Sequence, residues 1–158
     1  MPPLGRLMVR TALVWLLVGF TLGGLVLANK GLGWWPALWR FRASHAHILL
    51  AGWMVQFSVG VAFWILPRLG GGSRGRERLV WLGYVALNAG VACGFLYDLL
   101  VTSVNQAAVR LLPLAAGVLY VVAFVLFAAQ LWPRVLPLPE VALSSSADST
   151  RNDDPSSP

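Results

Sequence analysis

Long runs of apolar residues without a charged side chain occur four times along the chain. These runs are Thr11–Ala28, Ile48–Pro67, Leu79–Tyr97 and Leu111–Pro133. An α-helix rises about 1.5 Å per residue, so roughly 20 such residues cross the hydrocarbon core of a bilayer, which is about 30 Å thick. The pattern predicts an all-α fold, a polytopic bundle of four transmembrane helices over residues 7–28, 44–67, 78–101 and 108–133.

The composition also indicates a membrane protein. Of the 158 residues, 58% are hydrophobic and 11% are charged, and the mean hydropathy is +0.71. A soluble domain usually carries about 25% charged residues. We therefore expect residues 1–138 to form a membrane domain whose main partner is the lipid bilayer. Residues 139–158 are rich in Ser, Asp and Pro, which predicts a disordered cytoplasmic tail.

The first apolar run has a second interpretation. Arg6 and Arg10 precede it and Ala28 ends it, as in a secretory signal with a small residue at the cleavage site. Its uncharged stretch is longer than the usual apolar region of a signal peptide, which favours a helix that is retained.

The basic residues predict an orientation, because Lys and Arg near helix ends stay on the cytoplasmic side. Seven basic residues lie on the side of both termini: Arg6, Arg10, Arg68, Arg74, Arg76, Arg78 and Arg134. Four lie on the other side: Lys30, Arg40, Arg42 and Arg110. We expect a bacterial cytoplasmic (inner) membrane with both termini in the cytoplasm. Nucleic-acid binding is not expected, because the one basic cluster, RLGGGSRGRER, is a short loop.

Two histidines, His45 and His47, lie in the segment FRASHAHILLAGW and are the only ones in the chain. On an α-helix capped by Ser44, two positions correspond to about 200° of rotation, so the rings point to opposite sides and cannot share one metal ion. The helical period places Gly52 and Gln56 on the His45 face. A glycine leaves room there for the edge of a flat macrocycle, and glutamine supplies a polar group at membrane depth.

The surroundings of His45 suit heme iron. A helix N-terminus disfavours imidazolium, and neutral imidazole is the form that binds iron. Arg40 and Arg42 precede the histidine by about one turn, where heme propionates would emerge, and Arg clamps carboxylates in a bidentate manner. The same residue types also anchor helix ends at a membrane interface without any ligand. The residues alone leave heme ligation and simple anchoring open.

The stretch RASHAHILLAGWMVQFSVGVAFWILPR resembles the second helix of the catalytic subunit I of heme-copper oxygen reductases, in particular cbb3-type cytochrome c oxidases and nitric oxide reductases. The shared pattern is an Arg-x-x-His opening, small residues in mid-helix and an aromatic end that runs into Pro and Arg, here Arg42, His45, Gly52, Gly60, Trp64, Pro67 and Arg68. The resemblance implies that His45 is an axial ligand of a low-spin heme. With the residue pattern, it predicts a heme b site with His45 as the iron ligand, His47 as an alternative ligand, and Arg40, Arg42, Gly52 and Gln56 around the cofactor.

The chain departs from that family in having no third histidine, whereas the family's copper and second heme are held by histidines on later helices. It is therefore not a complete oxidase by itself. We expect electron transfer or heme handling beside a respiratory complex, and the alternative is a heme-free structural or assembly subunit of a respiratory oxidase. The candidates for a sixth iron ligand are a histidine of a second copy of the chain, a residue of another respiratory subunit, Met54 and Met8. The remaining option is a five-coordinate heme.

Other residues predict packing rather than chemistry. Asn88 is expected to hydrogen-bond to a neighbouring helix, and Asp98 to pair with Arg110, Arg42 or His47. The single cysteine, Cys93, excludes an intrachain disulfide and lies in a small-xxx-small pattern that allows close helix packing, which the first helix repeats at Gly19 and Gly23. No nucleophile with a base and no phosphate loop is recognisable, so no catalytic residue is predicted.

Overall fold

The computed structural model describes residues 2–66, 76–101 and 107–135. Four helical stretches in this part of the chain are long and apolar enough to cross a membrane: Pro3–Leu32, Pro36–Ile65, Glu77–Leu100 and Leu112–Val135. The prediction of an all-α membrane protein with four spans is confirmed. The first two spans begin earlier in the chain than the apolar pattern indicated. The predicted tail, residues 139–158, and the basic loop around residues 68–74 lie outside the described residues.

The second span is assembled from four consecutive helical pieces. After α1 (Pro3–Leu32), a 3₁₀ helix, η1 (Pro36–Phe41), leads into α2 (Arg42–His47), a π-helix, η2 (Ile48–Val55), and α3 (Gln56–Ile65). The remaining elements are α4 (Glu77–Leu100), the short α5 (Ala107–Arg110) and α6 (Leu112–Val135). Gly33 ends α1 in the left-handed conformation, with φ 65°, a geometry that glycine adopts without a steric penalty.

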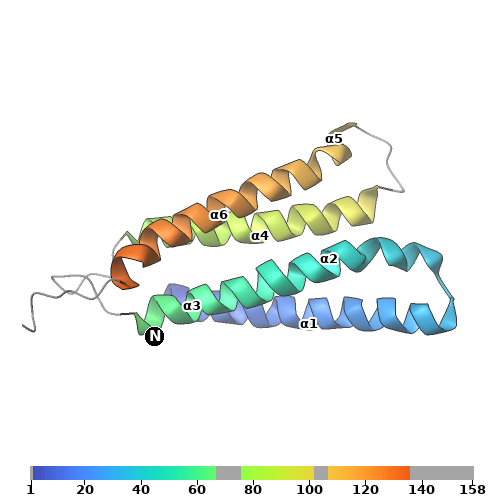
Figure 1. Cartoon of the computed structure of the whole chain (residues 1–158), viewed down its shortest axis with the longest axis horizontal. Coiled ribbons are helices and arrows are strands. Elements are labelled where there is room, and N and C mark those ends of the chain that lie inside the picture. The colour runs from blue at the N-terminus through green and yellow to red at the C-terminus, as the bar shows by residue number, and fades with distance from the viewer. Residues whose placement is uncertain (1, 67–75, 102–106, 136–158) are drawn as a thin grey trace, which may run out of the picture.

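The spans form two antiparallel pairs, α1 with the α2–α3 span and α4 with α6 (Figure 1). The buried core lies toward the end of the bundle that carries the N-terminus. Its members are Leu4, Met8, Phe63, Val80, Ala86, Leu87, Ala123 and Phe127. None of this cluster comes from η1 or α2, and a groove and a cavity lie beside α2 at the histidine end of the bundle.

The π-helix η2 interrupts the α-helical period in the middle of the second span. Its backbone bonds reach one residue further than those of an α-helix, as where the Gln56 N–H donates to the carbonyl of Ala51. One additional residue rotates everything beyond it by about 100° relative to a continuous α-helix. Residues on both sides of η2 nevertheless contact α1, since His45 lies against Gly19 and Gln56 Nε2 donates to the Met8 carbonyl.

A chain of hydrogen-bonded polar side chains, buried at Gln56 and partly buried at Trp15 and Asn88, crosses the bundle between the histidines and the core. Trp15 Nε1 donates to Asn88 Oδ1 at 2.7 Å, Asn88 Nδ2 donates to Gln56 Oε1 at 2.8 Å, and Gln56 Nε2 donates to the Met8 carbonyl at 3.1 Å. The network joins α1, α3 and α4 and satisfies groups that would be costly to leave unpaired in an apolar interior. The predicted interhelical role of Asn88 is confirmed.

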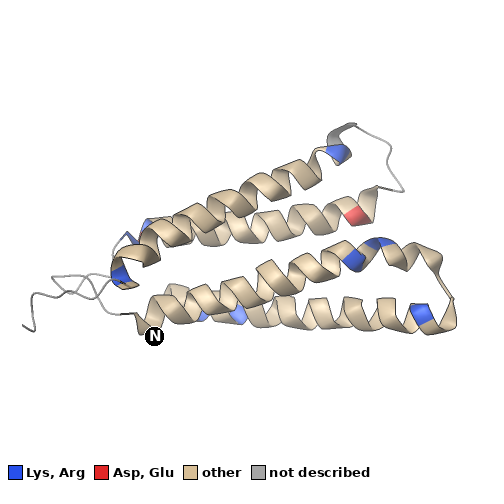
Figure 2. Cartoon of the chain, in the orientation of Figure 1, with Lys and Arg blue, Asp and Glu red and all other residues tan. Residues whose placement is uncertain are grey.

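Charged residues gather at the two ends of the bundle and leave its middle apolar (Figure 2). Arg134 is buried at the end of α6 and closes the end of the neighbouring α3. Its Nη2 donates to the carbonyls of Leu66 at 2.6 Å and Phe63 at 3.2 Å, and its guanidinium lies 5.3 Å from the centre of the Phe63 ring. Helix C-termini expose such carbonyls without intrahelical partners, so this arginine caps α3 from another span.

Candidate functional site

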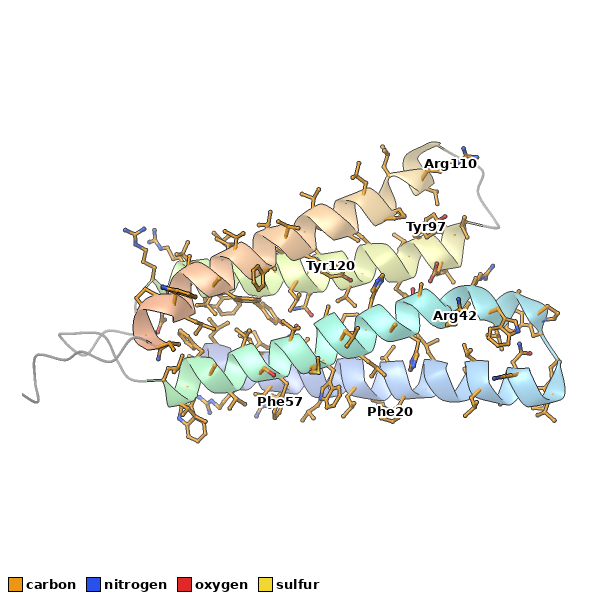
Figure 3. The ribbon with its side chains drawn as sticks, viewed as in Figure 1. Phe20, Arg42, Phe57, Tyr97, Arg110 and Tyr120 are labelled. Carbon is orange, nitrogen blue, oxygen red and sulfur yellow. The ribbon has the colours of Figure 1, made fainter. Side chains whose placement is uncertain are left out.

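His45 and His47 face different partners, as their spacing predicts. His45 is half-buried and faces α1, whereas His47 is exposed and faces α4 and α6. Arg42, on the same helix as both, lies toward the end of the bundle that also holds Tyr97 and Arg110, while Tyr120 lies between α6 and α4 (Figure 3). The turn that carries the histidines therefore forms the boundary between two separate sites.

The imidazole of His45 is fixed against α1. Its Nδ1 lies 2.8 Å from the carbonyl oxygen of Gly19. A carbonyl only accepts hydrogen bonds, so Nδ1 carries the proton and Nε2 of the neutral ring keeps its lone pair. Gly23, one turn after Gly19, lies directly against the ring, and a Cβ added there would overlap it. The two glycines of α1 thus create the space and supply the acceptor that orient His45.

A groove of about 630 Å³ opens beside this imidazole between α1 and the start of the second span. It combines one imidazole, two cationic side chains and two large aromatic rings on an otherwise apolar wall. The lining residues are Phe20, Gly23, Gly24, Val26, Leu27, Lys30, Trp39, Arg42 and His45. Such a surface suits a flat apolar ligand that bears anionic groups at one edge and needs a nitrogen donor.

Three residues that the sequence places with His45 do not line this groove. Gly52 lies beneath Trp15, where an added Cβ would come within 2.9 Å of Trp15 Cγ, and Gln56 is fully buried in the polar network. Both face α1, as His45 does, but they lie further along the span, against Trp15 and Met8, and therefore outside the groove. Arg40 lies with its guanidinium 4.9 Å from the centre of the Phe41 ring, outside the groove.

The two methionines considered as iron ligands also lie elsewhere. Met8 is fully buried in the core at the opposite end of the bundle. Met54 is exposed on the outer surface of η2, with a relative accessibility of 48%. Neither methionine lines the groove, and His45 is the imidazole among the lining residues that the structure describes.

His47 lines a second, smaller cavity of about 300 Å³ on the opposite face of α2. The cavity lies between α2, α4 and α6 and is lined by Ala43, Ser44, His47, Gly94, Tyr97, Asp98, Pro113, Ala116, Gly117 and Tyr120. Ser44 donates from its Oγ to Asp98 Oδ2 at 2.6 Å and from its backbone N–H to the same oxygen at 3.3 Å. Ser44 is therefore inside a helix and bonded to α4, and its predicted role as the helix N-cap is wrong. The sequence did not indicate Ser44 as a hydrogen-bond partner of Asp98.

Tyr120 contributes an unusual group to this second cavity. Its ring lies edge-on to His47, with ring centres 6.0 Å apart, and rests against Gly90. The phenolic oxygen is buried and has no hydrogen-bond partner among the described residues. A buried hydroxyl without a partner costs about 1–3 kcal/mol, so this position is stabilised by whatever acceptor reaches it.

The described residues contain no cluster of three or more His, Cys, Asp or Glu side chains of the kind that holds a metal ion. Cys93 is a free, partly buried residue of α4. Sequence reasoning missed Lys30, Phe20 and Trp39 of the groove and Tyr120 of the cavity, because these residues come from other elements. The one available signal was the Gly19 and Gly23 pair, which marked a face of α1 where another element approaches closely.

Comparison of the chain with protein-family models, with curated proteins and with solved structures finds no match in any of the three.

Proposed function

We propose that this protein is a heme b-binding integral membrane protein related to subunit I of cytochrome c oxidases, with His45 as the axial iron ligand. The observation that carries the proposal is the hydrogen bond from His45 Nδ1 to the Gly19 carbonyl. Heme-ligating histidines commonly donate their second ring nitrogen to a carbonyl or carboxylate, which fixes the ring and raises its basicity. His45 has this arrangement before any ligand is bound.

The groove beside His45 supports the same cofactor. A porphyrin is flat, and the glycine surface of α1 offers it a wall without side chains, since a Cβ at Gly24 would meet nothing within 4 Å. Arg42 and Lys30 would hold the two propionates, and Phe20 and Trp39 would pack against the ring edges. When bound, heme b supplies a one-electron carrier. The chain itself positions the imidazole, excludes water with apolar walls and balances the propionate charge.

In this proposal the protein transfers electrons or handles heme beside a respiratory complex of a bacterial inner membrane. Both termini are cytoplasmic, and the His45 groove lies toward the outer face. With two histidines in the sequence, the chain lacks the ligands for an oxygen-reducing centre of the oxidase type. A second copy of the chain or another respiratory subunit supplies the sixth iron ligand, or the iron remains five-coordinate.

The test is the reduced-minus-oxidised visible spectrum of the detergent-purified chain, expressed with heme supplied. We expect b-type α and Soret bands that disappear in His45→Ala and remain in His47→Ala. Gly24→Leu fills the groove without touching the ligand and is expected to abolish the bands as well. Gly31→Leu is the matched control, because its added side chain also meets nothing within 4 Å and it lies outside the groove. Absence of heme from the wild-type chain under these conditions excludes the proposal.

The second candidate is a heme-free structural or assembly subunit, which one observation favours. The His45–Gly19 hydrogen bond already joins α1 to the second span, so the ring has a structural role without iron. If this candidate is correct, His45→Ala lowers the melting temperature of protein that never contained heme. Under the heme proposal the loss of stability is largest for the heme-loaded protein, because a bound ligand stabilises the folded state by mass action.

A further inference from the structure

The cavity on the His47 side of α2 is not used by the proposed heme site and differs from it in size and chemistry. Its volume of about 300 Å³ is at the lower end of the range of small-molecule pockets, roughly 300–1,000 Å³. The groove beside His45 has about 630 Å³. The smaller cavity therefore has room for a single small ring system and not for a porphyrin.

The walls of the cavity are shaped for something flat. Gly94 of α4 and Ala116 and Gly117 of α6 have little or no side chain, and Tyr97 and Tyr120 present aromatic surfaces. A Cβ placed on Gly117 would meet nothing within 4 Å, so this wall is open and not already occupied by a neighbouring helix. Offset or edge contacts with aromatic rings favour a planar, conjugated ligand over a branched or charged one.

The polar groups define what such a ligand carries. The Tyr120 hydroxyl is buried without a partner among the described residues and is available to donate a hydrogen bond. Asp98 is 8% exposed and is held in place by the two bonds from Ser44, and His47 adds a ring nitrogen at the rim. A matching ligand has one oxygen that accepts from Tyr120 and a second oxygen that accepts from the ring N–H of His47 or, as a hydroxyl, donates to Asp98.

We infer that this cavity binds the head group of an isoprenoid quinone. A quinone ring is planar and carries oxygens on opposite edges, and its prenyl tail keeps it dissolved in the bilayer. His47 and Gly117 are both exposed on the bundle surface, so a tail has a direct path to lipid. The inference concerns binding and does not rest on heme at His45, because the two sites lie on opposite faces of α2 and share none of their lining residues.

The experiment is photolabelling of the purified full-length chain in lipid nanodiscs with an azido-benzoquinone, followed by peptide mapping. Competition with decylubiquinone and with menadione distinguishes a benzoquinone from a naphthoquinone ligand, and competition by either one supports the inference. We expect labelled residues on α2, α4 or α6 around His47. We also expect excess competitor to lower the labelling at least fivefold.

Two variants make the result specific. Gly117→Leu fills the cavity from its open wall, and Tyr120→Phe removes the hydroxyl while keeping the ring; each is expected to lower labelling at least fivefold. Gly24→Leu, which is equally free of clashes and fills the other groove, is the matched control and should label like the wild type. Size-exclusion profiles verify that all the variants fold.

Two outcomes would overturn the inference. One is labelling that neither quinone competes and that spreads over lipid-exposed positions of all four spans, as expected of a probe that only dissolves in the bilayer. The other is labelling near His47 that Gly117→Leu and Gly24→Leu lower equally, which would mean that cavity shape does not matter. Loss of heme from the His45 site leaves the labelling unchanged, so failure of one proposal is distinguishable from failure of the other.

Discussion

The two sides of the short helix α2 present the same side chain in different chemical settings. His45 is oriented by a backbone carbonyl of the adjacent span and opens onto a groove with Arg42 and Lys30. His47 is oriented by the edge of Tyr120 and opens onto a cavity whose charge is the carboxylate of Asp98. The first setting suits an anionic ligand that needs a nitrogen donor, and the second suits a neutral ligand that exchanges hydrogen bonds. The elements across from each histidine, more than the histidine itself, determine which chemistry is available.

Deletion of Leu50 is expected to have the largest effect, because it changes the His45 site and the His47 cavity at once. Removing one residue from η2 restores a regular α-helix and rotates the histidines relative to Gln56 by about 100°. Either the histidines leave their cavities or the Trp15–Asn88–Gln56 network loses its partners, at about 1–3 kcal/mol for each buried group. We expect the free energy of unfolding in mixed SDS micelles to fall by about 4 kcal/mol or more.

Leu50→Ala is the control for that deletion. The Leu50 side chain is exposed to lipid, so its truncation changes no contact of the network and should cost less than about 1 kcal/mol. If the deletion and the substitution have equal effects, the π-helix has no role in positioning the two sites.

Gly23→Ala is expected to weaken the His45 site and to leave the His47 cavity unchanged. The added methyl group overlaps the His45 ring and displaces it from the Gly19 carbonyl. Loss of such a supporting hydrogen bond weakens metal ligation by about 10- to 100-fold, so heme titration of the purified protein should show at least a tenfold weaker affinity. Quinone labelling at the His47 cavity should remain at the wild-type level.

The substitution Gly31→Ala adds the same methyl group to α1 where nothing lies within 4 Å and outside the groove. It should leave the heme affinity within about twofold of the wild type, since no contact of the ligand is changed. Equal losses in both variants would indicate a general effect on α1 and not displacement of His45.

Ser44→Ala is expected to weaken the packing of α2 against α4 on the His47 side. It removes the 2.6 Å hydrogen bond to the carboxylate of Asp98 and leaves that carboxylate buried with one bond fewer. Hydrogen bonds to charged groups contribute about 1.5–3 kcal/mol, so the free energy of unfolding should fall by about 2 kcal/mol. Ser58→Ala, at an exposed position of α3, should change stability by less than about 0.5 kcal/mol. A Ser44 effect no larger than that of Ser58 would contradict the geometry.

A pair of tyrosine substitutions is expected to give the smallest effects, with opposite signs. Tyr84 shares a 3.0 Å hydrogen bond with Thr11, and Tyr84→Phe should cost about 0.6 kcal/mol, a typical value for a membrane hydrogen bond. Tyr120→Phe removes a buried hydroxyl that has no partner among the described residues, so the ligand-free protein should be equally stable or slightly more stable. Thermal unfolding of both variants, without added quinone, is the measurement. A loss of stability in Tyr120→Phe as large as in Tyr84→Phe would show that the hydroxyl is already satisfied.

The spans and the opposite directions of the two histidines were predictable from the sequence, because each depends on local properties. Apolar runs of sufficient length predict spans, and two positions on one helical turn predict opposite faces. Asn88 was predictable in the same way, since a polar side chain within a span needs an interhelical partner.

The composition of the two sites was not predictable to the same degree. The Gly19 carbonyl, Lys30 and Tyr120 reach the histidines from other spans, and single-chain periodicity contains no information on which spans are neighbours. Gly52 and Gln56 share the α1-facing side of the span with His45, but they lie against Trp15 and Met8, outside the groove. The π-helix was not predictable either, since no residue type in the segment ILLAGWMV marks one.

The π-helix also affects how this chain can be compared with others. The second span contains one more residue than a straight α-helix that would join the same two halves, so an alignment without a gap can match only one half at a time. If the half with His45 is aligned with a regular helix, Gln56 and the residues after it are shifted by one position. If the half with Gln56 is aligned, His45 and the residues before it are shifted by one position. A relative of this protein is therefore best sought with the histidine segment and the glutamine segment as two separate patterns, with one insertion permitted between them.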